Sequence, residues 1–105
     1  MDKVIKILEE SGIPYAYDHF AEGESPPPPF ICFLIPESND FPADGKNYFR
    51  INRVHIELYT DRKNPELEGN LEYLLDKHSI FFTKSEVWIG SEQLYEVLYR
   101  FETEA

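Results

Sequence analysis

The chain has a single cysteine, few basic residues and no long hydrophobic run. With Cys32 alone it cannot form an internal disulfide, and folding in the cytosol fits this composition. Its 10 Lys and Arg face 20 Asp and Glu, so the formal net charge is −10 at pH 7. Proteins that bind DNA, RNA or anionic membranes do so with clustered positive charge, which argues against these classes. No apolar run approaches the ~20 residues that span a bilayer, and the N-terminus has no signal-peptide layout.

Patterns for catalysis and metal binding are missing as well. His55 and Glu57 share one face of an expected strand, and His19 follows Asp18, but closed zinc sets such as His-Glu-x-x-His or paired Cys-x-x-Cys are absent. Cys32 lies among Phe, Ile and Leu, where a cysteine is usually a small buried hydrophobe and not a nucleophile. We therefore predict that the protein is not an enzyme and has no catalytic residue, no metal site and no cofactor.

Hydrophobic residues make up 42% of the 105 residues and aromatic residues 15%, which suits one folded domain over residues 1–105. Periodicity and turn residues predict the order α-β-β-β-α-β-β. The expected elements are a helix over 2–11, strands over 15–20, 30–35 and 48–60 with a bend or bulge near 52–53, a helix capped by Asn64, a strand over 80–89 interrupted at 84–85, and a strand over 93–102, with long loops over 21–29 and 36–47.

The apolar residues of two elements predict where the core lies. Val54, Ile56 and Leu58 alternate along one strand face, and four leucines recur at helical spacing in the second helix, namely Leu67, Leu71, Leu74 and Leu75. Long antiparallel strands with two amphipathic helices indicate an α+β fold, in which both helices pack on one face of an antiparallel sheet.

Several apolar or loop residues are candidates for a subunit interface. Val87, Trp88 and Ile89 make both faces of their strand apolar, so a helix is expected to cover one face and something else the other, for which a partner subunit is one candidate. Phe30 follows four prolines, and Phe41 and Asp44 lie in the expected loop over 36–47. Long loops in compact domains are often functional, so we predict contacts there.

An ordered set of short segments resembles a known family. The segments are Phe41-Pro42-Ala43-Asp44, Ile56 to Thr60, Pro65 to Glu68, and Tyr95 to Glu102. They resemble small tail-completion proteins encoded in prophages of Gram-positive bacteria, similar to the tail terminators and tail-to-head joining proteins of long-tailed phages. The resemblance covers most of residues 15–102.

The resemblance implies an α+β fold, a homo-oligomeric ring of six subunits, and contacts with the phage tail tube protein and the head connector. It implies assembly in the cytoplasm of the bacterial host and a final place at the head–tail junction of the virion. It implies no catalysis and no cofactor, and it transfers no site residue. Acidic residues lining the bore of such a ring would repel DNA phosphates, so the genome would pass through without specific binding.

We therefore expect a structural protein that caps the tail tube and joins it to the head connector, without contact with a membrane. The alternative is an acidic DNA mimic that inhibits a nuclease or a restriction enzyme. A DNA mimic would need a double row of charges with phosphate-like spacing, whereas the acidic residues here are spread over the whole chain.

Overall fold

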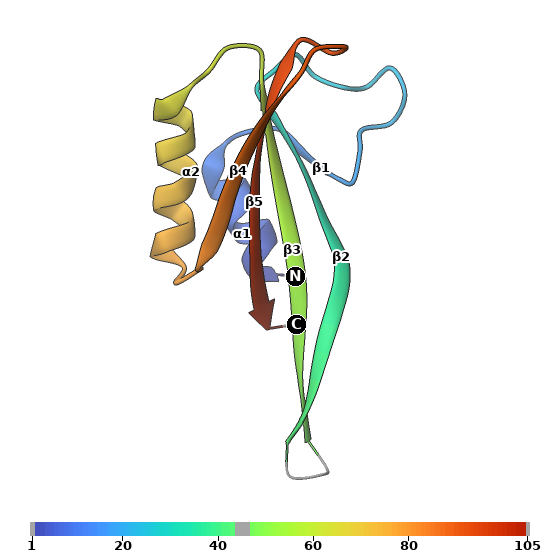
Figure 1. Cartoon of the computed structure of the whole chain (residues 1–105), viewed down its shortest axis with the longest axis vertical. Coiled ribbons are helices and arrows are strands. Elements are labelled where there is room, and N and C mark those ends of the chain that lie inside the picture. The colour runs from blue at the N-terminus through green and yellow to red at the C-terminus, as the bar shows by residue number, and fades with distance from the viewer. Residues whose placement is uncertain (1, 44–46, 105) are drawn as a thin grey trace.

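A computed structural model describes residues 2–43 and 47–104, with side chains described for 2–38 and 51–104. These residues form an α+β fold with the predicted order α-β-β-β-α-β-β (Figure 1). The elements are α1 (Asp2–Ser11), β1 (Tyr15–Tyr17), β2 (Phe30–Ala43), β3 (Asn47–Thr60), α2 (Pro65–Lys77), β4 (Phe82–Ile89) and β5 (Leu94–Glu104).

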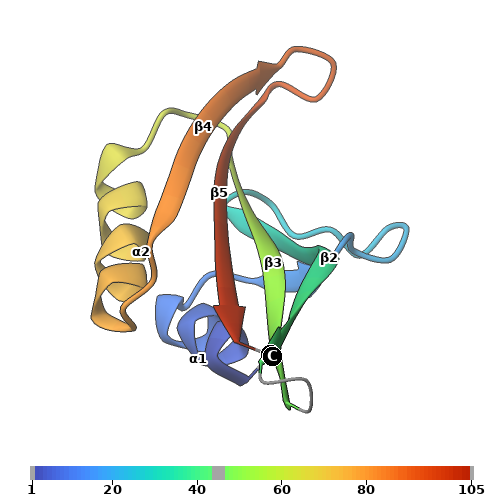
Figure 2. The same cartoon turned by 60° about the horizontal axis from the view of Figure 1, so that its bottom comes forward.

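The five strands form one sheet in the order β1-β2-β3-β5-β4. The pairs β2–β3, β3–β5 and β5–β4 are antiparallel, as expected, whereas β1 pairs with β2 in parallel, so the sheet is mixed. Both helices lie on the same side of the sheet, which leaves the other side without a helix (Figure 2). β4 is an edge strand.

The core lies between this sheet and the two helices. Val54, Ile56 and Leu58 are at most 1% exposed, and they pack with Leu71 and Leu75 of α2. The remaining two leucines of the helical stripe, Leu67 and Leu74, are partly buried against the same cluster. The predicted core is thus confirmed, and α1 adds Val4, Ile7 and Leu8 to it.

Local signals in the sequence fix the limits of α2. The Asn64 side chain accepts a hydrogen bond from the Leu67 backbone N–H at 3.1 Å, and Pro65 occupies the first turn. The helix ends at Lys77, and Ser79 then adopts a left-handed φ of 60° that turns the chain toward β4. The Asn64 cap and the turn at Ser79 therefore set where the helix begins and ends.

The expected loop over 36–47 is wrong for residues 36–43, which continue β2. They pair with β3 down to Ala43 opposite Asn47. Pro36 is tolerated because the register shifts between Leu34 and Glu37, so the bulge lies on β2, across from the position near 52–53 where we expected it. β5 ends its pairing at Ile51, so the far ends of β2 and β3 form a two-stranded arm (Figure 1).

Two other strands differ from expectation in their limits. β1 ends at Tyr17 because Asp18 takes a left-handed φ of 63°, which a strand cannot accommodate. β4 runs without interruption through Lys84 and Ser85. Lys84 faces α2, where it contacts Glu72 at 2.8 Å and Glu68 at 2.9 Å, so ion pairs hold this stretch against the helix.

Candidate interaction surface

The side of the sheet that no described helix covers presents ordered rows of side chains, and we call it the open face. Strand register defines each row, because residues paired across neighbouring strands lie side by side. From the β4–β5 turn toward the arm, the rows are Phe30, Tyr59, Glu96 and Val87; then Cys32, Glu57, Leu98 and Ser85; then Leu34, His55, Arg100 and Thr83.

The first row holds two of the predicted interface residues, one at each end. Phe30 stacks on Tyr59, with ring centroids 5.1 Å apart and planes at 24°, and Phe20 meets Phe30 edge to face at 5.6 Å. Val87 ends the same row and is 51% exposed. The row is therefore apolar at both ends, and Phe30 is partly covered by its own chain.

Between those ends, one hydroxyl serves two carboxyl groups. The Tyr59 hydroxyl lies 3.1 Å from Oε1 of Glu57 and 3.0 Å from Oε2 of Glu96. Burial and the nearby negative charge of Glu96 raise the pKa of Glu57, although the hydrogen bond from Tyr59 partly opposes them. A neutral tyrosine donates only one proton, so both contacts are satisfied together only when one carboxyl group is protonated.

The end of β4 places the other predicted interface residues. Val87 and Ile89 belong to the open face, whereas Trp88 points to the helix side and packs beside Tyr95 at 4.7 Å between ring centroids. Trp88 nevertheless remains 48% exposed. Exposed apolar residues therefore lie on both sides of an edge strand, at Val87 and Trp88.

Two predicted interface residues do not join this group. Phe41 belongs to β2 within the two-stranded arm, at the opposite end of the sheet from Val87 (Figure 1). Asp44 lies outside the described residues. The structure thus gathers the end of β4 and Phe30 around one row, and it separates Phe41 from them.

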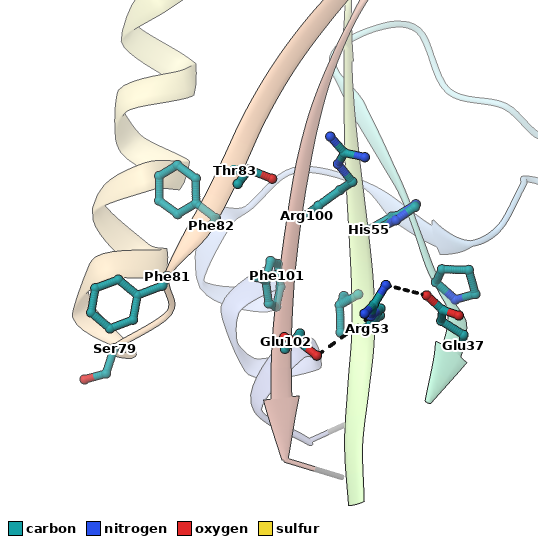
Figure 3. Close-up of a pocket in the computed structure, with 12 residues that line it drawn as sticks. Glu37, Arg53, His55, Ser79, Phe81, Phe82, Thr83, Arg100, Phe101 and Glu102 are labelled. Carbon is teal, nitrogen blue, oxygen red and sulfur yellow. Dashed lines mark hydrogen bonds and ion pairs between the residues drawn. The ribbon is translucent and has the colours of Figure 1, made fainter. Parts of the chain in front are cut away.

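The sequence analysis missed a groove of about 750 Å³ on the open face, between Phe81 and Glu37 (Figure 3). Arg53 crosses its lower part and contacts Glu37 at 2.7 Å and Glu102 at 3.8 Å. Phe81, at the rim, is 95% exposed. Arg100 lines the groove in the row above. Alternation along β5 does indicate that Arg100 shares a face with Glu102, but it does not show that β2 reaches far enough to supply Glu37.

The Cys32 thiol on the open face is not prepared for nucleophilic attack. Cys32 is 6% exposed, and burial together with the nearby carboxyl groups of Glu57 and Asp18 raises the pKa of its thiol to about 11. The thiol therefore stays protonated at neutral pH, whereas a nucleophilic cysteine needs a lowered pKa. Within residues 2–43 and 47–104, no group of three or more His, Cys, Asp or Glu is arranged to hold a metal ion. No helix among these residues is long and apolar enough to cross a membrane.

Comparison with known proteins gives a match in fold but none in sequence. No family model matches the chain, and no curated protein matches it. Among solved structures, a chain in the virion of a native gene transfer agent particle is similar, with a TM-score of 0.57 and 11% sequence identity. The match covers 93% of this chain and 82% of the other. At this identity, the comparison shows that the two chains share a fold.

Proposed function

We propose that this protein is a structural component of a phage-like virion. The observation that carries the proposal is the shared fold with a chain of a gene transfer agent virion, which extends over 93% of this chain. The protonated state of Cys32 at neutral pH fits a role in which this thiol is not a nucleophile.

Within the virion, we propose the role of a tail terminator or tail-to-head joining protein. The protein would close into a ring, with six subunits by the family resemblance, cap the tail tube and present a surface to the head connector. The apolar end of β4, around Val87, Trp88 and Ile89, would supply part of the subunit contact. The arm that holds Phe41 projects from the body and would reach a neighbour (Figure 1).

Charge sets a condition on this assembly. Each copy brings a formal charge of −10, so neighbouring subunits repel one another until salt screens the charges, with a screening length of ~10 Å at 0.1 M. We therefore expect rings to form more readily as the salt and protein concentrations rise. The same acidic character would let DNA slide through the bore without binding.

Light scattering across salt and protein concentration, followed by negative-stain microscopy, tests ring formation. Adding purified tail tubes tests the cap, because tube growth should stop when the protein binds. A protein that stays monomeric at high salt and concentration, together with normal tail length in a phage lacking it, would refute the terminator role. A tight monomer that binds a nuclease would support the DNA-mimic alternative instead.

A further inference from the structure

We propose that the groove between Phe81 and Glu37 receives the acidic loop, residues 21–25, of the next copy of this chain. The inference rests on the proposed ring and names the contact that would close it. It begins with Arg100, whose guanidinium forms no ion pair or hydrogen bond with the residues that the structure describes.

The surroundings of Arg100 leave its charge available to a partner. Its row holds His55 and Thr83, which carry no negative charge. In the adjacent rows, the carboxyl group of Glu102 contacts Arg53 at 3.8 Å and that of Glu57 contacts the Tyr59 hydroxyl at 3.1 Å. An unpaired arginine beside a groove is a strong site for a carboxylate, because its guanidinium can bind both carboxylate oxygens at once.

The rim of the groove adds an apolar contact. Phe81 is 95% exposed and lies across the groove from Glu37 (Figure 3). Phe81 and Arg100 thus line the same groove, and phenylalanine and arginine are both enriched in protein interfaces. The groove therefore fits an extended acidic segment that also covers an aromatic ring.

The acidic loop of a second copy has the complementary properties. Glu22 and Glu24 are exposed, and their carboxylates have no partner among the described residues. Gly23 between them has a φ of 80°, which turns the chain and sets the loop away from the sheet. The loop leaves the molecule beside the start of β2 (Figure 1). Groove and loop are different surfaces, so their contact is heterologous and generates a ring when the rotation closes.

Charge-reversal variants test this contact by the concentration dependence of assembly. Arg100→Glu should weaken assembly by about tenfold or more, since truncating one partner of a desolvated charge pair has effects of this size. Arg62→Glu is the matched control, because it makes the same charge change at an exposed residue outside the groove. Arg100→Gln, which adds no new charge, should weaken assembly in the same direction, and thermal melting should show that the variants fold.

The double variant Glu22→Lys/Glu24→Lys separates the contact from general repulsion. It lowers the net negative charge, so overall electrostatics predicts easier assembly, whereas the proposed contact predicts weaker assembly. A 1:1 mixture with Arg100→Glu should restore rings, because every groove then meets a loop of opposite charge when the two variants alternate. Assembly by the double variant at wild-type strength, or no recovery in the mixture, would overturn the inference.

An experiment with a peptide separates this inference from the proposed ring. If the wild-type protein forms no ring, the proposed ring fails, but a synthetic peptide of residues 20–30 still tests the groove. The peptide should shift the NMR amide signals of Thr83, Arg100 and Phe101, and it should do so less with Arg100→Glu. Wild-type rings that are unchanged by Arg100→Glu, or a peptide that shifts none of these signals, would refute the groove contact.

Discussion

Glu68 offers the sharpest test of how α2 is held to the sheet. Its side chain is 3% exposed, yet it is charged and lies 2.7 Å from Nζ of Lys63 and 2.9 Å from Nζ of Lys84. Burial alone would raise the pKa of Glu68, but the hydrogen bonds from the two lysines outweigh it and lower the pKa. The two lysines are 41% and 37% exposed. The acid is thus buried, whereas its partners reach water.

Because Glu68 is buried and its two lysines are exposed, removing the lysines should lower the free energy of unfolding more than removing the charge of Glu68. Lys63→Met/Lys84→Met leaves a buried carboxylate without compensation and should cost about 3–5 kcal/mol of the free energy of unfolding. Glu68→Gln leaves two lysines that are solvated and still contact Glu86 and Glu72, so it should cost about 1 kcal/mol. Methionine keeps the apolar stem of each lysine, so packing changes little. Urea denaturation followed by far-UV circular dichroism at pH 7 measures both costs.

The pH dependence of the stability provides a second readout, because its trend should be opposite in the wild-type protein and in the double lysine variant. In the wild-type protein the lowered pKa of Glu68 means that its contribution is present above the ordinary pKa and is lost as the pH falls through the folded pKa. Without the lysines, burial remains and raises this pKa, so stability should increase as the pH falls from neutral. The reasoning is refuted if Glu68→Gln costs as much as the double lysine variant, or if the pH trend of the double variant matches the wild type.

Three further tests address the core, the open face and metal dependence. Leu71→Ala should cost about 2–5 kcal/mol in urea denaturation, since Leu71 is 1% exposed in the core, and a loss below about half a kcal/mol would place it outside. The raised pKa of Glu57 means that the folded state holds its proton more tightly, so wild-type stability should fall as the pH rises through that pKa. Glu57→Gln should remove this loss. If the stabilities of the two proteins change with pH in parallel, the pairing of the Tyr59 hydroxyl with one protonated carboxyl group is wrong. A metal chelator should leave the melting temperature unchanged, and zinc found by elemental analysis would overturn this expectation. Cys32→Ser should affect assembly only through stability.

Periodicity predicted most of the fold because the core depends on which side of each element is apolar. Alternation in β3 and the leucine stripe of α2 depend only on local spacing, so both the core and the element order could be predicted. The same logic failed for residues 36–43. Their Asn, Asp and Pro content is typical of a loop, yet backbone pairing with β3 keeps them in a strand, and pairing between distant segments leaves no mark in local composition.

The direction of β1 and the rows of the open face could not be predicted from the sequence, for a related reason. β1 has three residues, and nothing in Tyr15–Tyr17 distinguishes parallel from antiparallel pairing. Alternation assigns Glu57 and Tyr59 to one face, but only the register between β3 and β5 brings Glu96 beside them. The groove at Arg100 depends further on the unexpected length of β2, which supplies Glu37.

The two ends of the open face suit a partner with different properties, one apolar and one acidic, and we argue that a copy of the same chain can be this partner. The end near the β4–β5 turn is apolar at Val87, whereas the groove end has an unpaired arginine at Arg100. In the proposed ring, a neighbouring copy with a net charge of −10 would bring its own acidic loop to the arginine. The total charge still repels, and because local contacts are desolvated they are screened less by salt than the long-range repulsion is. Salt should therefore favour the proposed ring even though an ion pair would close it, whereas a ring that dissociates as salt rises would show that surface charge pairs dominate the interface.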